Sequence, residues 1–482
     1  MSVNIKNPSR LYIGGEWVEP LDGAPIEVIS PNTEQVAFTV AGAGPKDMDR
    51  AVAAARAAFE KGDWSLAPAI ARIDAVERLA RALERRTDEL SAAWTQQMGA
   101  LPALAPFLVT QGTQNLFNAV AVGRRFQFEE KIESPVAPNA RIVHDPIGVV
   151  AAITPWNVPY MLMTTKIGSA LIAGCTVVMK PSPETPIEAY IIAECAEEVG
   201  IPAGVINLVP SQREAVDHLM RNPDVDKVAF TGSTAVGRHI AQICGERIRR
   251  YTLELGGKSA AIVLDDFSDE EAAKLLSGTI CMMSGQICAM LTRVIVPRHR
   301  HDSLAAAIAA EMKKVRIAHS EDPDAQMGPL ATKRQLERVE NYVKLGLEQG
   351  ATLVTGGSRP AQPNRGFFFE PTLFANVDNA MTIAQEEIFG PVISLIPCED
   401  VDDAIRIAND SIYGLNASVL THDAAAAAKV ARRLRSGNVA QNGLRTDFAL
   451  PTGGFKQSGV GREGGELGLF SYLETKTVLL DA

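Results

Sequence analysis

Short apolar runs alternate with helical patterns along most of the chain. Residues 147–153 (IGVVAAI) and 176–180 (TVVMK) are almost wholly apolar, which predicts strands that are covered on both faces. Residues 185–199 carry apolar side chains at helical spacing, and Thr185 followed by Pro186 predicts the cap and first turn of this helix. Strands that alternate with helices in this way indicate an open, parallel α/β sheet.

The same alternation continues into the second half of the chain. Further strands and one further helix are predicted from similar patterns, at residues 161–173 (the helix), 205–209, 227–231, 260–264 and 291–296. A strand-like segment at 11–20 and helical patterns at 49–59 and 72–94 precede them, and strand–helix alternation extends to about residue 439. We therefore expect two open α/β units, the first of which would hold a ligand at the carboxyl ends of its strands.

Two charged segments lie outside this pattern. In residues 124–142, Glu, Lys and Arg alternate with apolar residues. In residues 471–480, Thr and Lys alternate with apolar residues. Both predict exposed strands, and the first is expected to form a hairpin. Because exposed strand edges readily pair with other chains, these segments suggest contact with another subunit.

The amino-acid composition is that of an ordinary globular protein, and the net charge argues against some classes of binding partner. Of 482 residues, 46% are hydrophobic and 22% are charged. The 47 Lys and Arg against 57 Asp and Glu give a net charge of −10, so we expect no nucleic-acid partner. No apolar run approaches the length of a membrane helix, and the first residues lack the apolar core of a signal peptide. A cytoplasmic protein without a membrane partner is expected.

Cysteine and histidine usage argues against disulfides and metals. The six cysteines form no CxxC pair and are too sparse for a disulfide scaffold, which indicates a reducing compartment. The seven histidines include no HExxH motif, so no metal site is expected. Cys175 and Cys195 are expected to be core residues.

Two motifs that suggest nucleotide binding lack the required context. Residues 459–464 (GVGREG) match GxGxxG, but a polar loop precedes them near the end of the chain, where a dinucleotide motif needs a strand. Residues 257–259 (GKS) look like the end of a P-loop, but Thr252 stands where that loop needs glycine. Neither is expected to bind a phosphate.

Four features of the sequence are candidates for catalysis or ligand binding, and they are more convincing together than alone. Cys288, alone, is best explained as a core cysteine. Asn157 follows a predicted strand, where its amide could donate to a developing oxyanion, although a turn asparagine is the simpler explanation. In residues 230–237 (FTGSTAVG) a strand runs through glycine into a helix, which suits a phosphate group. Glu254 lies among apolar residues and glycines, so its pKa should rise as suits a general base.

Together these segments resemble the aldehyde dehydrogenase superfamily, NAD(P)-dependent enzymes with a catalytic cysteine. The matches are in order and cover almost the whole chain: YIGGEW, TPWNVP, KPSPETP, FTGSTAVG, LELGGKS, SGQIC, EEIFGPV, NDSIYGLNASV and GGFKQSGVGREGG. The resemblance implies an α/β aldehyde dehydrogenase-like fold. It would comprise a Rossmann-type cofactor domain (1–123 and 147–256), an α/β catalytic domain (257–456) and a small β oligomerisation arm (124–146 and 466–482). Such arms build homodimers or homotetramers.

The resemblance also implies a mechanism. Cys288, as the thiolate, would attack the aldehyde carbonyl, and the Asn157 amide and the Cys288 backbone N–H would hold the oxyanion. Hydride transfer to the nicotinamide would leave a thioester, and Glu254 would activate water to hydrolyse it. Because CoA-acylating relatives lack this glutamate, Glu254 favours the hydrolytic type. The CoA-acylating reaction, and a non-catalytic structural protein on the same fold, remain alternatives.

The family's cofactor residues carry over to ten positions, which are Thr154, Trp156, Lys180, Ser182, Gly232, Ser233, Gly237, Leu255, Glu387 and Phe389. NAD is the favoured cofactor. The family often has a glutamate three residues after the ribose lysine, and here that position is Pro183, with Glu184 next to it. NADP therefore stays open.

Substrate contacts are expected by position at Tyr160, Met161, Leu162, Ile287, Ala289, Leu444, Arg445 and Phe448. Most of these side chains are apolar, which favours an aliphatic, terpenoid or aromatic aldehyde. Arg445 leaves a semialdehyde open, because a guanidinium can bind a carboxylate bidentately. Arg462 and Glu463 are expected to form a structural ion pair, and Lys258 is given no catalytic role.

Overall fold

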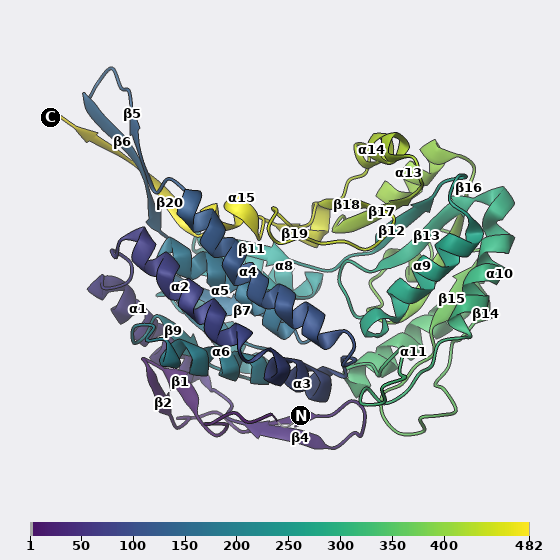
Figure 1. Cartoon of the computed structure of the whole chain (residues 1–482), viewed down its shortest axis with the longest axis horizontal. Helices are drawn as coiled ribbons and strands as arrows, with labels where there is room; N and C mark the ends of the chain where they lie inside the picture. The colour runs from purple at the N-terminus through teal and green to yellow at the C-terminus, as the bar shows by residue number, and fades with distance from the viewer. Residues whose placement is uncertain (1–2, 482) are drawn as a thin grey trace.

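Two sheets organise residues 3–481, the part of the chain that the computed structural model describes (Figure 1). The first has eight strands in the order β19-β11-β10-β7-β8-β9-β1-β2. Its strands are β1 (Leu11–Ile13), β2 (Glu16–Val18), β7 (Val149–Ile153), β8 (Thr176–Lys180), β9 (Ile206–Leu208), β10 (Lys227–Thr231), β11 (Arg250–Glu254) and β19 (Gly459–Val460). The five consecutive strands from β11 to β9 are parallel, as predicted.

Helices cover both faces of this sheet and bury two separate apolar clusters. The helices of the first half are α1 (Pro45–Lys61), α2 (Ala69–Glu84), α3 (Thr87–Met98), α4 (Ala105–Arg125), α5 (Pro159–Ala173), α6 (Ile187–Glu198), α7 (Arg213–Arg221) and α8 (Thr234–Glu246). Helices α2 to α6 pack on one face, and α1, α7 and α8 pack on the other. The near-continuous apolar strands are thus explained by burial on both sides.

Three sequence predictions need correction in this half. The pattern at 72–94 forms two helices, α2 and α3, which are separated by Arg85 and Arg86. Residues 11–20 contain two strands, joined by a turn in which Gly14 and Gly15 have positive φ.

The third correction concerns the start of α6. Thr185 does not cap this helix, because α6 begins at Ile187 with Pro186 at the cap position. The Thr185 hydroxyl instead donates to the Trp156 carbonyl at 3.2 Å. It therefore fastens a neighbouring loop rather than a helix end.

The second sheet has seven strands in the order β14-β15-β16-β13-β12-β17-β18. They are β12 (Ser259–Val263), β13 (Leu291–Pro297), β14 (Thr352–Thr355), β15 (Thr372–Ala375), β16 (Val392–Cys398), β17 (Asn416–Leu420) and β18 (Asn438–Gln441). Its helices are α9 (Asp269–Cys281), α10 (His301–Met312), α11 (Lys333–Glu348), α12 (Thr382–Gln385), α13 (Val401–Asn409) and α14 (Ala424–Ala431). The expectation of two α/β units is confirmed.

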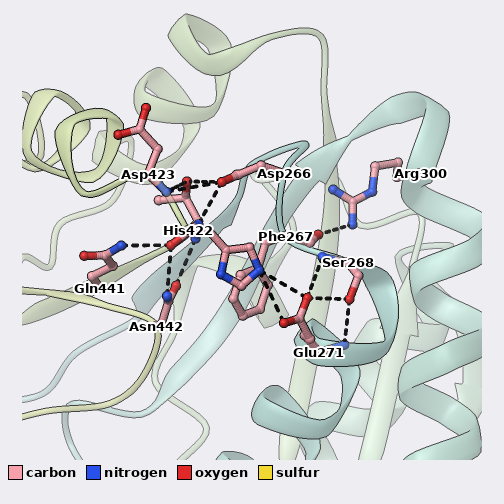
Figure 2. A network of polar contacts seen from close by, with 10 residues as sticks. Asp266, Phe267, Ser268, Glu271, Arg300, His422, Asp423, Gln441 and Asn442 are labelled. Atoms are coloured by element: carbon pink, nitrogen blue, oxygen red, sulfur yellow. Dashed lines mark hydrogen bonds and ion pairs between the residues drawn. The ribbon is translucent and has the colours of Figure 1, made fainter.

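A polar network joins the loops that follow β12 and β17 at the carboxyl end of this second sheet (Figure 2). The Asp266 carboxylate accepts from the backbone N–H groups of His422 and Asp423 at 2.8 and 3.2 Å. His422 also reaches the Glu271 carboxylate at 3.3 Å, beside the Ser268 cap of α9. These hydrogen bonds therefore hold together the loops after two neighbouring strands, β12 and β17.

A three-stranded arm projects from the body (Figure 1). It consists of β5 (Glu129–Ile132), β6 (Asn139–Pro146) and β20 (Leu473–Leu480) in the order β20-β6-β5. Both exposed strands expected from the sequence are thus confirmed, and all pairings in the arm are antiparallel. The short helix α15 (Gly465–Phe470) precedes β20, and a separate hairpin contains β3 (Ile26–Ile29) and β4 (Val36–Val40).

No helix within residues 3–481 combines the length and apolar character needed to cross a bilayer. The predicted cofactor domain and arm extend to residues 1, 2 and 482, which lie outside the described residues.

Candidate active site

Two cavities meet along the carboxyl ends of the first sheet. The inner one, of about 430 Å³, reaches Cys288, and the outer one, of about 470 Å³, reaches Lys180. They share the lining residues Pro155, Trp156, Arg213, Thr231, Gly232, Ser233 and Arg334. Because they share one wall, the two cavities form a single groove. It lies where the sequence predicted a ligand.

Cys288 and Asn157 both line the inner cavity. The Asn157 side-chain nitrogen donates to the Gln286 carbonyl at 3.0 Å, and the Asn157 backbone carbonyl accepts from the Trp94 indole N–H at 2.8 Å. Asn157 is 2% exposed. Its side chain and its backbone are therefore each held by one hydrogen bond, and the amide nitrogen carries a second hydrogen that its bond leaves available.

The surroundings of Cys288 disfavour loss of the proton from its thiol. Burial raises the pKa of the thiol to about 12, and the carboxylates of Glu387 and Glu254 contribute to the rise. A thiolate is the nucleophilic form of cysteine. A reaction at this sulfur therefore needs a group that removes the proton.

Glu254 ends β11, where Gly232 donates its N–H to the Glu254 carbonyl at 3.0 Å. Its side chain is 9% exposed, and one carboxylate oxygen has no hydrogen-bond partner among the described residues. Burial raises the pKa of this carboxyl well above its usual range, and the charge of Glu463 adds to the rise. The predicted direction is confirmed. Glu254 is not among the residues that line the inner cavity, but it is near enough to act on the pKa of Cys288.

A buried ion pair behind Glu254 was not foreseen from the sequence. The Lys166 ammonium contacts the Glu463 carboxylate and donates to the Thr231 hydroxyl at 2.7 Å. Arg462 instead donates to the carbonyls of Gly454 and Gly461. The expected Arg462–Glu463 pair is therefore wrong, because the buried α5 lysine takes the carboxylate.

Two glycines let a loop pass between the groups of the site. A Cβ on Gly256 would lie 2.3 Å from the Glu387 carboxylate, and one on Gly257 would lie 2.5 Å from the Cys288 carbonyl oxygen. The Gly257 N–H donates to Glu387 at 3.1 Å. Burial raises the pKa of Glu387 to about 7. The glycines thus bring Glu387 close to the thiol.

Aromatic rings form another wall of the inner cavity. Trp156 and Phe389 meet edge to face, with centroids 5.3 Å apart. Phe389 has a φ of +62°, and its carbonyl accepts from Gln335 at 2.7 Å. The strained backbone conformation is thus supported by a partly buried hydrogen bond.

The outer part of the groove offers groups of the kind that bind phosphate and ribose. Ser233 caps α8, so this helix directs its N-terminus toward the groove. Lys180 is 6% exposed, and burial lowers its pKa to about 8. The buried Thr154 hydroxyl has no partner among residues 3–481. A charged residue and an unpaired hydroxyl in a cavity indicate a polar ligand.

Nine of the ten expected cofactor positions line the groove. They are Thr154, Trp156, Lys180, Ser182, Gly232, Ser233, Leu255, Glu387 and Phe389. Gly237 does not line it, and instead packs under Leu255, whose side chain leaves no room for a Cβ. None of residues 459–464 lines the groove.

The expected substrate residues are more scattered. Only Leu162 lines the inner cavity, whereas Tyr160 and Met161 line a small separate cavity of about 10 Å³. The Tyr160 hydroxyl lies 2.8 Å from the Thr113 hydroxyl. Arg445 is exposed on the loop after β18.

The other expected substrate residues flank the site or pack on the cores. Ile287 and Ala289 adjoin Cys288 in the chain. Phe448 packs on the helical core of the first unit, and Leu444 packs on a core of the second unit. The sequence positions alone did not tell which of these side chains would reach the cavity.

Four residues that line the inner cavity lie outside every motif found in the sequence: Arg213, Arg334, Gln335 and Arg338. They lie at the starts of α7 and α11, and no local motif distinguishes them from surface residues of a helix. Arg334 and Gln335 come from the second unit, so only the packing of the two units brings them to the groove.

The remaining cysteines behave as expected. Cys175 and Cys195 are fully buried and free.

Lys258 is 2% exposed, and burial lowers its pKa to about 7. Among the described residues no cluster of His, Cys, Asp and Glu could hold a metal ion.

Comparison with known proteins gives a consistent result. Residues 17–478 match the Aldehyde dehydrogenase family. The chain is 41% identical over 472 residues to a geranial dehydrogenase of Castellaniella defragrans, and 40% identical over 474 residues to a 3-succinoylsemialdehyde-pyridine dehydrogenase of Pseudomonas. Each alignment covers 98% of both chains.

A solved structure has the same fold throughout. Aldehyde dehydrogenase C of Pseudomonas syringae, in complex with NAD+ and octanal, is 37% identical with a TM-score of 0.95. The alignment covers 99% of this chain and 98% of that one.

Proposed function

The chain belongs to the aldehyde dehydrogenase family, and from that premise we propose that it oxidises an aldehyde to the carboxylic acid with NAD+ and hydrolyses the acyl group from its own cysteine. One observation carries this proposal. Cys288 and Asn157 line the same inner cavity, at one end of a groove suited to a dinucleotide.

The groove fits NAD+ by its chemistry. The N-terminus of α8 and Ser233 suit the pyrophosphate, and Lys180 and the unpaired Thr154 hydroxyl suit the adenosine ribose. Glu387 suits the hydroxyls of the nicotinamide ribose. When bound, NAD+ supplies the hydride acceptor. NADP+ is the alternative, because Pro183 offers no carboxylate against a 2′-phosphate.

The side chains of Cys288, Asn157 and Glu254 each have a separate role in the proposed reaction. The Cys288 thiol loses its proton to water in the groove, and Glu254, whose raised pKa suits a general base, stays available for the later hydrolysis step. The Cys288 sulfur attacks the carbonyl carbon, and the Asn157 amide donates to the oxygen that becomes negative. After oxidation the acyl group is held on the sulfur as a thioester. Glu254 takes a proton from water, which attacks that thioester and releases the acid.

An apolar aldehyde is the proposed substrate class. The inner cavity contains Leu162, Trp156 and Phe389 beside Cys288. The related proteins named for geranial and crystallised with octanal are consistent with an aliphatic or terpenoid chain. A semialdehyde is the second candidate, because Arg445 is exposed and a relative is named for a succinoyl semialdehyde.

We further propose the division of the chain that the family resemblance implies. Residues 1–123 and 147–256 form the cofactor domain, 257–456 the catalytic domain, and 124–146 with 466–482 an arm that builds a homodimer or homotetramer. The six free cysteines, among them a nucleophile, suit the reducing cytoplasm.

The test is NADH and NADPH formation across an aldehyde panel with wild-type protein and Cys288→Ala. The panel contains octanal, geranial, benzaldehyde, betaine aldehyde and succinate semialdehyde. We expect NADH formation with an apolar aldehyde and none with the variant. Folded protein that binds NAD+ but oxidises no aldehyde, and that becomes active on addition of CoA, would instead support an acyl-CoA product.

A further inference from the structure

We propose that Gln286 is a positioning residue, which fixes the Cys288 segment and the Asn157 amide in one arrangement. The inference rests on the proposed function. Gln286 does not line the groove and is fully buried, two residues before the sulfur.

The side-chain amide of Gln286 bridges two segments. Its nitrogen donates to the Met283 carbonyl at 2.8 Å, and its oxygen accepts from the Ala331 N–H at 2.9 Å. The backbone carbonyl of the same residue accepts from Asn157 at 3.0 Å. One residue therefore connects the nucleophile segment, the amide proposed to hold the oxyanion, and the segment that leads into α11.

The backbone before Gln286 needs such support. Met283, Ser284 and Gly285 have positive φ of 51°, 54° and 75° in succession. Two consecutive non-glycine residues in the left-handed region are costly. The Ser284 hydroxyl donates to the Gly328 carbonyl at 2.7 Å, so this turn is fastened to the same segment that Gln286 reaches. Removing the Gln286 bridge should therefore let the turn relax toward ordinary conformations.

The anchoring segment also carries the other side of the site. Thr332 caps α11, and Gln335 in its first turn donates to the carbonyls of Ile388 and Phe389 at 3.0 and 2.7 Å. The start of α11 thus holds the Glu387–Phe389 segment directly and the Cys288 segment through Gln286. The position of the sulfur relative to the cofactor end is set by this common support.

Only a side chain with both a donor and an acceptor at this length can make both bonds. Methionine has a similar length and makes neither strongly. An ionised glutamate keeps the acceptor for Ala331 but loses the donor to Met283. A protonated glutamate has both again, which makes the charge state of Gln286→Glu a direct reporter of the bridge.

The first experiment compares Gln286→Met with Gln97→Met. Gln97 is a buried glutamine that serves as the control: it is 1% exposed, donates to the Ala93 carbonyl at 3.1 Å and to the Glu188 carboxylate at 2.9 Å, and accepts from the Ile187 N–H at 3.1 Å, but it does not touch the nucleophile segment. We expect kcat to fall about 10- to 100-fold in Gln286→Met, with the KM for NAD+ within about twofold. Gln97→Met should keep the kcat of the wild type.

A second readout needs no turnover. In the cofactor-free Gln286→Met variant, the Cys288 segment is no longer held by the Gln286 side chain, so Cys288 should react with iodoacetamide several-fold faster than in the wild type. Mass spectrometry should show that the other five cysteines stay unlabelled. General unfolding would label all six. Equal labelling rates together with an unchanged kcat would overturn the proposal, whereas an inactive wild type would overturn the proposed function.

Coupling to Asn157 is tested with a double-mutant cycle. If Gln286 acts through Asn157, the loss in kcat/KM for Gln286→Met with Asn157→Ala should be smaller than the product of the two single losses. Full additivity would contradict this part of the inference.

Gln286→Glu keeps the proposal testable if the methionine variant does not fold. Its kcat relative to wild type should be highest at low pH and fall as the carboxyl ionises. A ratio that is independent of pH would count against the bridge.

Discussion

At the scale of single residues, the surroundings of Cys288, the proposed nucleophile, disfavour its thiolate form. Burial raises the pKa of the Cys288 thiol to about 12, and the carboxylates of Glu387 and Glu254 add to the rise. Proton removal within the site is then part of the chemistry.

Glu254 should be needed mainly after the acyl group has formed. In Glu254→Gln we expect the steady-state rate to fall about 10²- to 10⁴-fold. A burst of NADH, one per active site, should remain if the thiol can lose its proton by another route, and stopped-flow absorbance measures it. Glu188→Gln is the control, since Glu188 is a buried carboxyl of α6 outside the groove. Loss of the burst as well would mean that Glu254 is the base for Cys288.

The charge on Glu387 should control the reactivity of the thiol. The anion raises the pKa of Cys288, so Glu387→Gln should lower that pKa and speed iodoacetamide labelling at pH 9 several-fold. The effect should shrink below pH 7, because Glu387 itself has a pKa of about 7 and becomes neutral there. Labelling rates measured from pH 6 to 10 in cofactor-free protein test this, with Cys288→Ala as the blank. Equal rates for variant and wild type at every pH would contradict it.

At the scale of elements, loops carry the chemistry and the sheets position the loops. Strands β11 and β12 belong to different sheets, and only Leu255–Lys258 joins them. This short connection passes between Glu387 and the Cys288 carbonyl, where a side chain does not fit. The close approach of the two units depends on it.

A methyl group at Gly257 should therefore disrupt the site. Its Cβ would lie 2.5 Å from the Cys288 carbonyl oxygen, so we expect Gly257→Ala to lower kcat at least about 100-fold and to lower the melting temperature. Gly278 in α9 is the matched control, since a Cβ there meets nothing within 4 Å. Gly278→Ala should stabilise the protein by roughly 0.5–1 kcal/mol. Thermal melts and kcat for both variants decide the matter, and an active Gly257→Ala enzyme would refute the packing argument.

Strands were easier to predict than helix ends. A strand buried on both faces needs a continuous apolar run, and β7 and β8 were visible for that reason. The break between α2 and α3 was not, because the apolar spacing continues through Arg85 and Arg86. Thr185 failed as a cap because its hydroxyl found a tertiary partner, the Trp156 carbonyl.

At the scale of the whole molecule, the arm has exposed apolar side chains that the rest of the described chain does not cover. Its strands carry exposed apolar side chains, including Ile132, Leu479 and Leu480. Within residues 3–481, no further strand pairs with either edge of the three-stranded sheet, β20 or β5. Unpaired apolar edges usually meet a partner.

A charge on the arm should therefore weaken the homodimer or homotetramer that we propose. Leu479 is 54% exposed, and Leu479→Glu should shift the protein toward smaller species in light scattering coupled to size-exclusion chromatography. Leu347→Glu is the control, because Leu347 is 50% exposed on α11, away from the arm. An unchanged mass for Leu479→Glu at micromolar concentration would remove the arm from the interface.

The sequence by itself determined the α/β class, the strands of the arm and the family resemblance, and it singled out Cys288, Asn157 and Glu254 as the proposed catalytic residues. These follow from local patterns and ordered motifs, which a chain carries wherever it folds. Only the tertiary structure decided the Lys166–Glu463 pair, whose members are 297 residues apart, and the arginines that line the groove. It also decided that Gln286 bridges to Ala331 and that Tyr160 faces Thr113 rather than the inner cavity. Such contacts depend on how two separately patterned units pack, and no local spacing encodes that packing.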